Sequence, residues 1–201
     1  VEAKSIGSVT PKQLENLSRE HILRSVVPAH LRIKELEKTA FIPGKTFVPV
    51  SGPLIDTDDI NGLVDVALKG WFTAGEVNDT FEASLSRSIG ARHVLTTNSG
   101  SSALLLAVSA LTSHTLGDRR LAPGDEVITV AAGFPTTVNP LLLYGLVPVF
   151  VDVDIPTYNV DAEALASAIG PRTKALVLPH TLGNLFDIDK VLAVAENHGL
   201  W

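Results

Sequence analysis

Short apolar segments alternate with helix-like segments over the second half of the sequence, and this alternation restricts the fold more than any other feature. The apolar segments are rich in Val, Ile and Leu. Nearly continuous apolar strands that alternate with helices are typical of a parallel sheet covered by helices on both faces. We therefore predict an α/β fold with strands at His93–Thr96, Glu126–Val130, Val147–Val151 and Ala175–Leu178, and helices at Ser102–Leu111, Pro135–Tyr144, Asp161–Ile169 and Ile188–His198.

Ligands of such sheets bind in the crevice at the carboxyl ends of the strands. This rule selects the segments that follow the four predicted strands. They are Asn98–Ser102, Ala131–Thr137, Asp152–Asp154 and His180–Asn184.

The first of these segments, Asn98-Ser-Gly-Ser-Ser102, is a turn of small residues in front of a helix. Free backbone N–H groups and the positive end of the helix dipole make such a turn suitable for binding an anion. Gly100 has no Cβ, so a phosphate can approach the main chain. An ordinary helix cap formed by Ser99 or Ser101 is the alternative interpretation.

The other segments each have a functional and a structural interpretation. Phe134 is either a core residue at the start of a helix or an aromatic face for a planar ring. Asp152 and Asp154 are either paired carboxylates or parts of a turn, and we favour the turn. A lone histidine such as His180 is more often structural than catalytic. The sequence has neither a cluster of metal ligands nor a Gly-x-Ser-x-Gly motif.

The first half of the sequence has a different character. Pro11–Thr39 has helical spacing, and we expect two helices because Pro28 interrupts the pattern. Phe41–Pro53 is rich in proline and glycine and is predicted to be an extended connector. Beyond it we expect a helix that begins at the Asp56–Asp59 caps and ends near Lys69, and a loop from Gly70 to Gly75. A further helix should open at Asn78 or Asp79 and end near Gly90.

Composition excludes several classes of function. The 201 residues carry a formal net charge of −6 without a dense basic cluster, which argues against nucleic-acid binding. The absence of cysteine excludes disulfides and thiolate clusters within these residues. No apolar run approaches the roughly 18 residues of a membrane span, and the N-terminus does not resemble a secretory signal. We therefore expect a soluble cytoplasmic protein that binds neither nucleic acid nor membrane.

The two ends of the sequence suggest a piece of a longer protein. The first residue, Val1, is not a methionine. Gly199 is predicted to end a helix, and Leu200-Trp201 then has the character of a new strand.

An ordered series of motifs resembles the DegT/StrS-type sugar aminotransferases. The similarity extends from about Val48 to Trp201. The motifs that carry it are Leu95-Thr-Thr-Asn-Ser-Gly-Ser-Ser-Ala103, Pro123-Gly-Asp-Glu-Val-Ile128, Gly133-Phe-Pro-Thr-Thr-Val-Asn-Pro140, Pro148-Val-Phe-Val-Asp-Val-Asp154 and Thr157-Tyr-Asn159. The long connection Leu111–Leu121 and the segment His180–Phe186 are most similar to the branch of deoxysugar 3-dehydrases, with CDP-6-deoxy-L-threo-D-glycero-4-hexulose as substrate.

This resemblance implies a fold and its domains. The fold is the three-layer α/β sandwich of the large domain of type I aspartate aminotransferase-like, pyridoxal phosphate-dependent transferases. Residues 48–201 would form the first part of that domain, and residues 1–47 an N-terminal helical arm and connector.

The resemblance also implies a cofactor site and a substrate site. Gly100 and Ser101, with Ser102, match the turn that holds the phosphate of pyridoxamine or pyridoxal phosphate. Phe134 matches the aromatic residue that stacks on the cofactor ring. Trp71, Thr73 and Gly75 belong to a loop that lies near the sugar-nucleotide site in this family.

The implied reaction removes the C3 hydroxyl from a nucleotide-linked 4-keto-6-deoxyhexose. In this branch a histidine replaces the usual lysine, and a [2Fe–2S] cluster passes electrons from a flavin iron–sulfur reductase partner. The family also implies a homodimer. The matching catalytic base, the aspartate that pairs with the ring nitrogen and the cluster cysteines all fall beyond Trp201, so we assign no catalytic or metal-binding residue here and expect residues 1–201 to be inactive alone.

Two alternatives remain open at the level of the sequence. The first is an ordinary nucleotide-sugar aminotransferase, which uses a lysine and transfers an amino group. The second is a non-catalytic module that binds a cofactor or a sugar nucleotide. The nucleotide carrier, CDP or dTDP, also stays undetermined.

Overall fold

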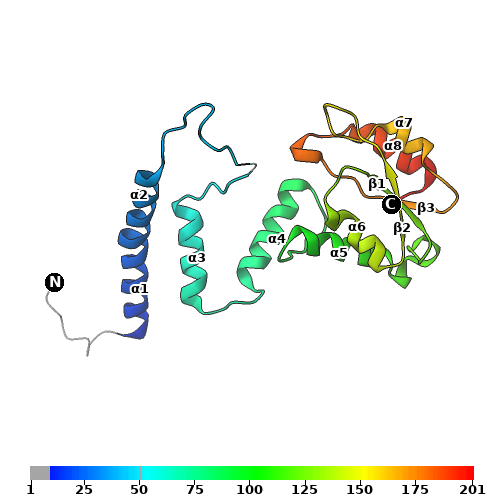
Figure 1. Cartoon of the computed structure of the whole chain (residues 1–201). Coiled ribbons are helices and arrows are strands. Elements are labelled where there is room, and N and C mark those ends of the chain that lie inside the picture. The colour runs from blue at the N-terminus through cyan, green and yellow to red at the C-terminus, as the bar shows by residue number, and fades with distance from the viewer. Residues whose placement is uncertain (1–9, 50) are drawn as a thin grey trace. The chain divides into compact units, whose positions relative to one another are not determined.

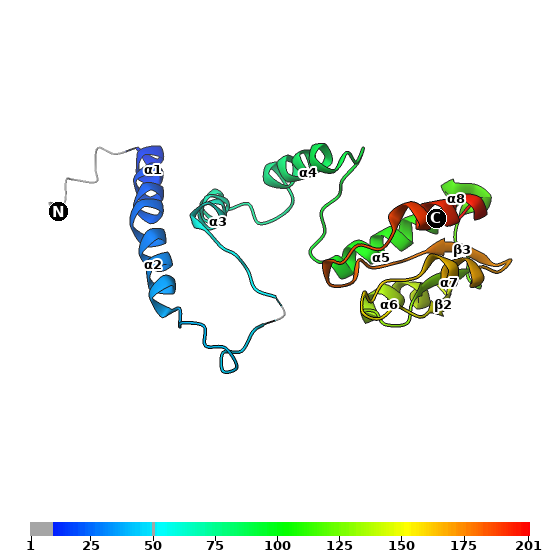
Figure 2. The same cartoon turned by 90° about the horizontal axis from the view of Figure 1, so that it is seen from above.

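The computed structural model describes residues 10–49 and 51–201, and the chain divides into two compact units, Val1–Ala91 and Arg92–Trp201 (Figures 1 and 2). The units are defined by the contacts within each of them. The predicted domains, 1–47 and 48–201, were drawn from sequence similarity and stay a prediction.

The first unit begins with helical residues that run through Pro28 without a break. Helix α1 (Pro11–His21) continues through a π-helical turn, η2 (Ile22–Val26), into α2 (Val27–Glu37). The two expected α-helices are therefore present, but a π-helical turn directly before Pro28 joins them and the helical run does not break. The wider turn places a bond from the N–H of Val27 to the carbonyl of Ile22 directly before Pro28. Pro28 then lies in the first turn of α2. At that position the backbone N–H that proline lacks is not needed for a hydrogen bond within the helix.

Two further helices complete this unit, and both end where their sequences predict. Helix α3 (Thr57–Lys69) begins at a capping box formed by Asp56 and Asp59, and α4 (Glu76–Ile89) begins two or three residues before the predicted start at Asn78 or Asp79. Gly70 and Gly90 end the two helices in the left-handed conformation, with φ of 66° and 70°. The guanidinium of Arg19 in α1 donates two hydrogen bonds, of 2.6 and 2.8 Å, to the carboxylate of Asp65 in α3.

The second unit is built on a parallel sheet with the order β2-β1-β3. Strands β1 (Glu126–Val130) and β2 (Val147–Val151) have the predicted bounds, and β3 (Thr173–Leu176) begins two residues earlier than predicted. Trp201 continues the pairing beside β3. Its N–H donates to the carbonyl of Lys174 (3.0 Å), and its carbonyl accepts from the N–H of Leu176 (2.8 Å).

Helices cover both faces of this sheet, which confirms the three-layer α/β prediction. Figure 1 shows α5 (Gly100–Leu111) and α6 (Pro135–Leu143) on one side of the strands, and α7 (Ala162–Ser167) and α8 (Ile188–His198) on the other. Each face has its own buried cluster, because successive side chains of a strand point to opposite faces. The first contains Val108, Leu121, Val127, Leu141, Leu146 and Ala175, and the second contains Ile128, Val130, Val151, Val160, Leu165 and Val191.

The strand predicted at His93–Thr96 does not form. These residues belong to no strand of the described sheet, and Leu95 is 73% exposed. An apolar run becomes a strand only where another strand offers its edge, and the described sheet provides no neighbour here.

The long connection between α5 and β1 packs against the end of the chain. It contains the short helix η3 (His114–Arg119). The indole N–H of Trp201 donates to the carbonyl of Arg119 (2.8 Å), and the Arg119 guanidinium lies 3.7 Å from the centre of the Trp201 ring. This contact combines a hydrogen bond with a cation–π interaction.

Candidate functional site

Helices α5 and α6 both begin at the carboxyl edge of the sheet. Helix α6 connects the end of β1 to the start of β2, so its first turn lies at that edge. Helix α5 packs beside α6, and its last residue, Leu111, accepts a hydrogen bond from Leu121 shortly before β1. The positive ends of both helix dipoles therefore face the crevice in which parallel α/β sheets bind ligands.

The turn before α5 acts as a helix cap and leaves two donors beside it. The Ser99 hydroxyl accepts from the N–H of Ser102 (3.2 Å), and the Ser99 carbonyl accepts from Ala103 (3.0 Å). The N–H groups of Gly100 and Ser101, at the first two positions of α5, have no acceptor within the helix itself. A Cβ added to Gly100 would have no atom within 4 Å, so the space above this backbone is open. The cap and the predicted anion site thus occupy the same turn.

Phe134 stands at the N-cap of α6, and its ring is exposed. Its backbone is extended, with φ of −84° and ψ of 138°, and Pro135 follows as the first helical residue. The side chain is 72% exposed. The interpretation of Phe134 as a core residue is therefore wrong, and the ring has a face available for another planar group.

A pocket of about 290 Å³ lies between α5 and α6. Ser101 is the only predicted cofactor residue that lines it; Gly100, Ser102 and Phe134 do not. Sequence reasoning missed Asn139, while Thr136 falls within a selected segment but was not singled out. The lining residues are Ser101, Leu105, Thr136, Asn139, Pro140 and Leu143. Ser101 and the helix that Phe134 caps thus lie on the same face of the sheet, as the predicted cofactor site requires.

The loops after β2 and β3 are held by structural contacts. The carbonyl of Asp154 accepts a 2.6 Å bond from the N–H of Tyr158, which confirms the turn interpretation. The Asn184 amide donates to the carbonyl of Thr157 (2.9 Å) and ties the two loops together. The ring of His180 lies 4.2 Å from that of Phe186. In the described part of the chain, no group of His, Cys, Asp or Glu residues is placed to hold a metal ion.

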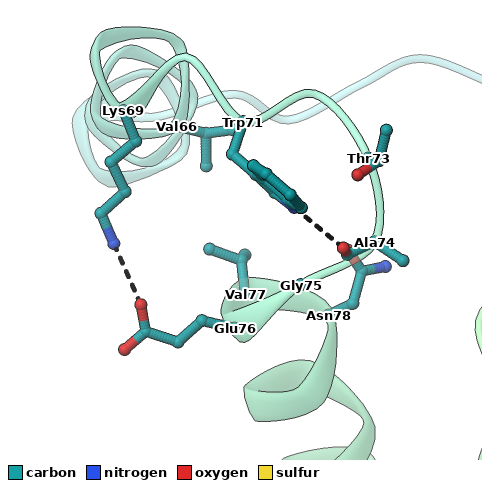
Figure 3. Close-up of a pocket in the computed structure, with 9 residues that line it drawn as sticks. All are labelled: Val66, Lys69, Trp71, Thr73, Ala74, Gly75, Glu76, Val77 and Asn78. Carbon is teal, nitrogen blue, oxygen red and sulfur yellow. Dashed lines mark hydrogen bonds and ion pairs between the residues drawn. The ribbon is translucent and has the colours of Figure 1, made fainter.

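The predicted substrate residues Trp71, Thr73 and Gly75 come together in one pocket of the first unit (Figure 3). The pocket has a volume of about 390 Å³, and its lining is mostly apolar. Sequence reasoning missed the side chains that α3 and the first turn of α4 add, because two helices and a loop must fold together to place them. These side chains are Val66, Lys69, Glu76, Val77 and Asn78.

Three contacts fix the shape of this pocket. The indole N–H of Trp71 donates to the carbonyl of Ala74 (2.9 Å). The Lys69 ammonium lies 3.4 Å from a carboxylate oxygen of Glu76. A Cβ on Gly75 would lie only 2.9 Å from Nε1 of Trp71, so the present position of the ring requires glycine there.

The carboxyl groups with displaced pKa values belong to ion pairs and helix caps. The hydrogen bond from Arg19 lowers the pKa of Asp65, and the ion-paired Lys38 lowers that of Glu35. The backbone N–H of Lys190 lowers the pKa of Asp187, the N-cap of α8. In each case the neighbouring group stabilises the charged carboxylate, so the lowered pKa reflects a structural contact.

Comparison with known proteins places this arrangement in a family. The family model described as the DegT/DnrJ/EryC1/StrS aminotransferase family matches residues 53–201. The chain is 51% identical over 186 residues to the lipopolysaccharide biosynthesis protein RfbH of Salmonella typhimurium, covering 92% of this chain and 42% of that protein. It is 46% identical over 184 residues to the dTDP-4-dehydro-2,6-dideoxy-D-glucose 3-dehydratase of Saccharopolyspora spinosa, covering 92% and 39%.

A solved structure shows the same fold. The GDP-4-keto-6-deoxy-D-mannose-3-dehydratase of E. coli, with bound hydrated PLP, is 32% identical, with a TM-score of 0.70 over 76% of this chain and 39% of that one. The chain thus spans about two fifths of the length of the relatives that it matches. Its neighbours are pyridoxal phosphate-dependent enzymes of the type I aminotransferase-like fold. The chain belongs to the DegT/DnrJ/EryC1/StrS aminotransferase family.

Proposed function

We propose that the whole protein is a pyridoxamine or pyridoxal phosphate-dependent enzyme that removes the C3 hydroxyl from a nucleotide-linked 4-keto-6-deoxyhexose. The similarity to the 3-dehydratase of Saccharopolyspora spinosa, at 46% identity over 92% of this chain, carries the proposal. The E. coli relative is also a 3-dehydratase. The substrate names of these two relatives contain dTDP and GDP, while the sequence motifs are most similar to enzymes with a CDP-linked substrate. The carrier therefore needs a direct measurement.

The residues at the carboxyl edge of the sheet fit a phosphorylated aromatic cofactor. Gly100 and Ser101 offer backbone donors in open space at a helix start, and Ser102 contributes a hydroxyl beside them. The exposed Phe134 ring would stack on the cofactor. When bound, such a cofactor supplies a conjugated ring that takes up charge as bonds to the substrate break.

These side chains bind and orient, but they leave the proton transfer unassigned. Removing a proton from the substrate needs a positioned acid or base, which typically contributes about 10²- to 10⁴-fold in rate. His180 packs on Phe186, and Asp154 belongs to a turn, so neither is assigned this role. Contacts that bind the substrate and the transition state equally well do not speed the chemical step. We therefore propose that residues 1–201 alone do not turn over substrate.

The [2Fe–2S] cluster does not fit the donors of these residues. Such clusters are held by cysteine thiolates, and the 201 residues contain no cysteine. The flavin iron–sulfur reductase partner, the homodimer and the cytoplasmic location are proposals that rest on resemblance to the family.

Transamination is the second candidate reaction, because the matching family model is described as an aminotransferase family. A binding module without activity is the candidate from another class. To test this, the whole protein is incubated with a nucleotide-linked 4-keto-6-deoxyhexose, the cofactor, an amino donor and a reductant. A product that has lost oxygen at C3 supports the 3-dehydrase, and a product with an amino group at C4 identifies the aminotransferase. Binding of the sugar nucleotide without either product identifies the module.

A further inference from the structure

A leucine at the carboxyl edge of the sheet has a conformation and an exposure that the fold does not require. Leu182 lies in the short turn η4 (Thr181–Gly183), in the loop after β3, at the edge where parallel α/β sheets bind ligands. Resting on the proposed function, we infer that its side chain contacts the C6 methyl group of the 4-keto-6-deoxyhexose. Leu182 would thereby select sugars that lack a hydroxyl at C6. The resemblance to the family assigns no role to this residue.

The backbone of Leu182 is strained. Its φ of 54° and ψ of 28° lie in the left-handed region, where the Cβ of an L residue crowds the backbone and glycine or asparagine is usual. In the part of the chain that the structure describes, Tyr158 is the one other non-glycine residue with a positive φ. Leucine therefore lowers the stability of the fold at this position, and strained residues of this kind cluster at functional sites.

The side chain of Leu182 adds a second cost. It is 93% exposed, so it buries almost no apolar area against the described residues. An exposed leucine gives up the free energy that its burial would supply. Glycine or asparagine would avoid both costs. The reason for a leucine therefore lies outside the loop, in a group that covers its side chain when bound.

Hydrogen bonds hold the loop in place around Leu182. The N–H of Asn184 donates to the carbonyl of Thr181 (3.0 Å), which closes the turn. The side-chain amide of Asn184 donates to the carbonyl of Thr157 (2.9 Å) and fixes the turn to the loop after β2. The position of Leu182 is thus set before any ligand arrives, as a residue that discriminates between ligands requires.

An apolar group is the part of the substrate that suits this leucine. Residues 152–161 and 180–187, which form the two loops, contain neither lysine nor arginine, so the loops offer a diphosphate no cation. A sugar hydroxyl placed against leucine would lose water and gain no hydrogen bond.

The methyl group of a 6-deoxyhexose, at C6, has no such requirement. The substrate names of the two 3-dehydratase relatives share this 6-deoxy group, while they differ in the nucleoside diphosphate and at C2. A leucine that recognises C6 is therefore compatible with both of these substrates.

The test measures selectivity at C6 with the whole protein. The unaltered protein is given a nucleotide-linked 4-keto-6-deoxyhexose and, separately, the matching 4-keto-hexose that keeps its C6 hydroxyl, on the same carrier. We expect kcat/KM to be about ten- to a hundredfold higher for the 6-deoxy sugar, since an apolar pocket rejects an added hydroxyl within this range. Titration calorimetry with the same two sugar nucleotides gives the preference in affinity without any turnover.

Leu182→Asn is the decisive variant, because asparagine is similar in size and tolerates a positive φ. It should reduce the preference for the 6-deoxy sugar to about threefold or less. Its urea midpoint should stay the same or rise, because the strain is relieved. Leu182→Met keeps an apolar side chain and should retain most of the preference. The matched control is Leu192→Asn, which replaces a 51% exposed leucine within α8 and should leave the preference unchanged.

Three results would overturn the inference. The first is an unaltered protein without a preference at C6. The second is an unchanged preference in Leu182→Asn; a lower urea midpoint in that variant would then assign Leu182 to a packing contact within the whole protein. The third is that Leu182→Asn weakens the free nucleoside diphosphate as much as the 6-deoxy sugar nucleotide, which assigns the residue to the nucleotide.

The proposed function is tested separately by the same experiment. It fails if the unaltered protein converts neither sugar. In that case the affinities from calorimetry, and their dependence on Leu182, still decide whether this residue recognises C6.

Discussion

At the scale of residues, the sequence predicted those features that depend only on residues close together in the chain. The Asn98–Ser102 turn could be read from the sequence because a cap and a helix start depend on neighbouring residues. The exposure of Phe134 could not be read in this way, since it depends on what packs over α6. Lys69 and Asn78 were missed for the same reason: two helices and a loop bring them to Trp71.

Replacing Phe134 is the most specific single-residue test of the proposed cofactor site. Phe134→Ala should weaken binding of pyridoxal phosphate to the whole protein by about two- to tenfold, because one aromatic contact contributes ~0.5–1.5 kcal/mol. Thermal stability should change little, since the ring is exposed. The absorbance of the bound cofactor reports the affinity. Phe47→Ala, which removes another exposed ring, is the control; equal affinities in the two variants would exclude stacking on Phe134.

Asp65 gives a prediction about pH. The bond from Arg19 lowers its pKa in the folded state, so the pair stabilises the fold above the ordinary carboxyl range. That contribution is lost as the pH falls through the lowered pKa. Asp65→Asn should therefore reduce the urea midpoint near neutral pH and leave it nearly unchanged in strong acid. A difference from the parent that is the same at both pH values would contradict this assignment.

At the scale of elements, periodicity predicted best where an element is set by its own residues. Strands β1 and β2 and helix α8 have their predicted bounds. The segment His93–Thr96 has the composition of a strand, but its pairing depends on a distant edge. Pro28 was expected to interrupt a helix, and a single π-helical turn accommodated it instead. Composition could indicate neither outcome. The first depends on pairing with a distant strand, and the second on the backbone hydrogen bonds of the turn before Pro28.

The start of α5 offers a test of the capping contact. Ser99→Ala removes the hydroxyl that accepts from Ser102, and it should lower the free energy of unfolding by about 1 kcal/mol. Urea unfolding measures this change. Ser167→Ala is the matched control: its hydroxyl donates to the Glu163 carbonyl within a helix, so no cap is lost. Equal stability of the two variants would contradict a capping role for Ser99.

At the scale of the whole molecule, apolar side chains of the first unit remain uncovered. Phe41, Phe47, Trp71 and Phe72 are between 62% and 83% exposed. Exposed aromatic side chains of this kind are typical of a surface that meets a partner. Within the described residues, no helix is both long and apolar enough to cross a membrane.

We therefore expect the whole protein to form a homodimer. Sedimentation equilibrium at micromolar concentration should give the mass of two chains. Phe47→Asp should shift the equilibrium toward the monomer, since it places a charge on an exposed aromatic position, while Glu37→Asp should not. A monomer for the unaltered protein at that concentration would contradict the prediction.

In the proposed reaction, oxygen leaves the sugar at C3. The most direct measurement supplies the whole protein with a nucleotide-linked 4-keto-6-deoxyhexose that carries ¹⁸O at C3, together with pyridoxamine phosphate and a reductant. Mass spectrometry then follows the label in the sugar and in the released water. We expect the label to appear in water and to disappear from the sugar, with no amino group gained. A product that retains the label at C3 and carries an amino group at C4 would contradict it.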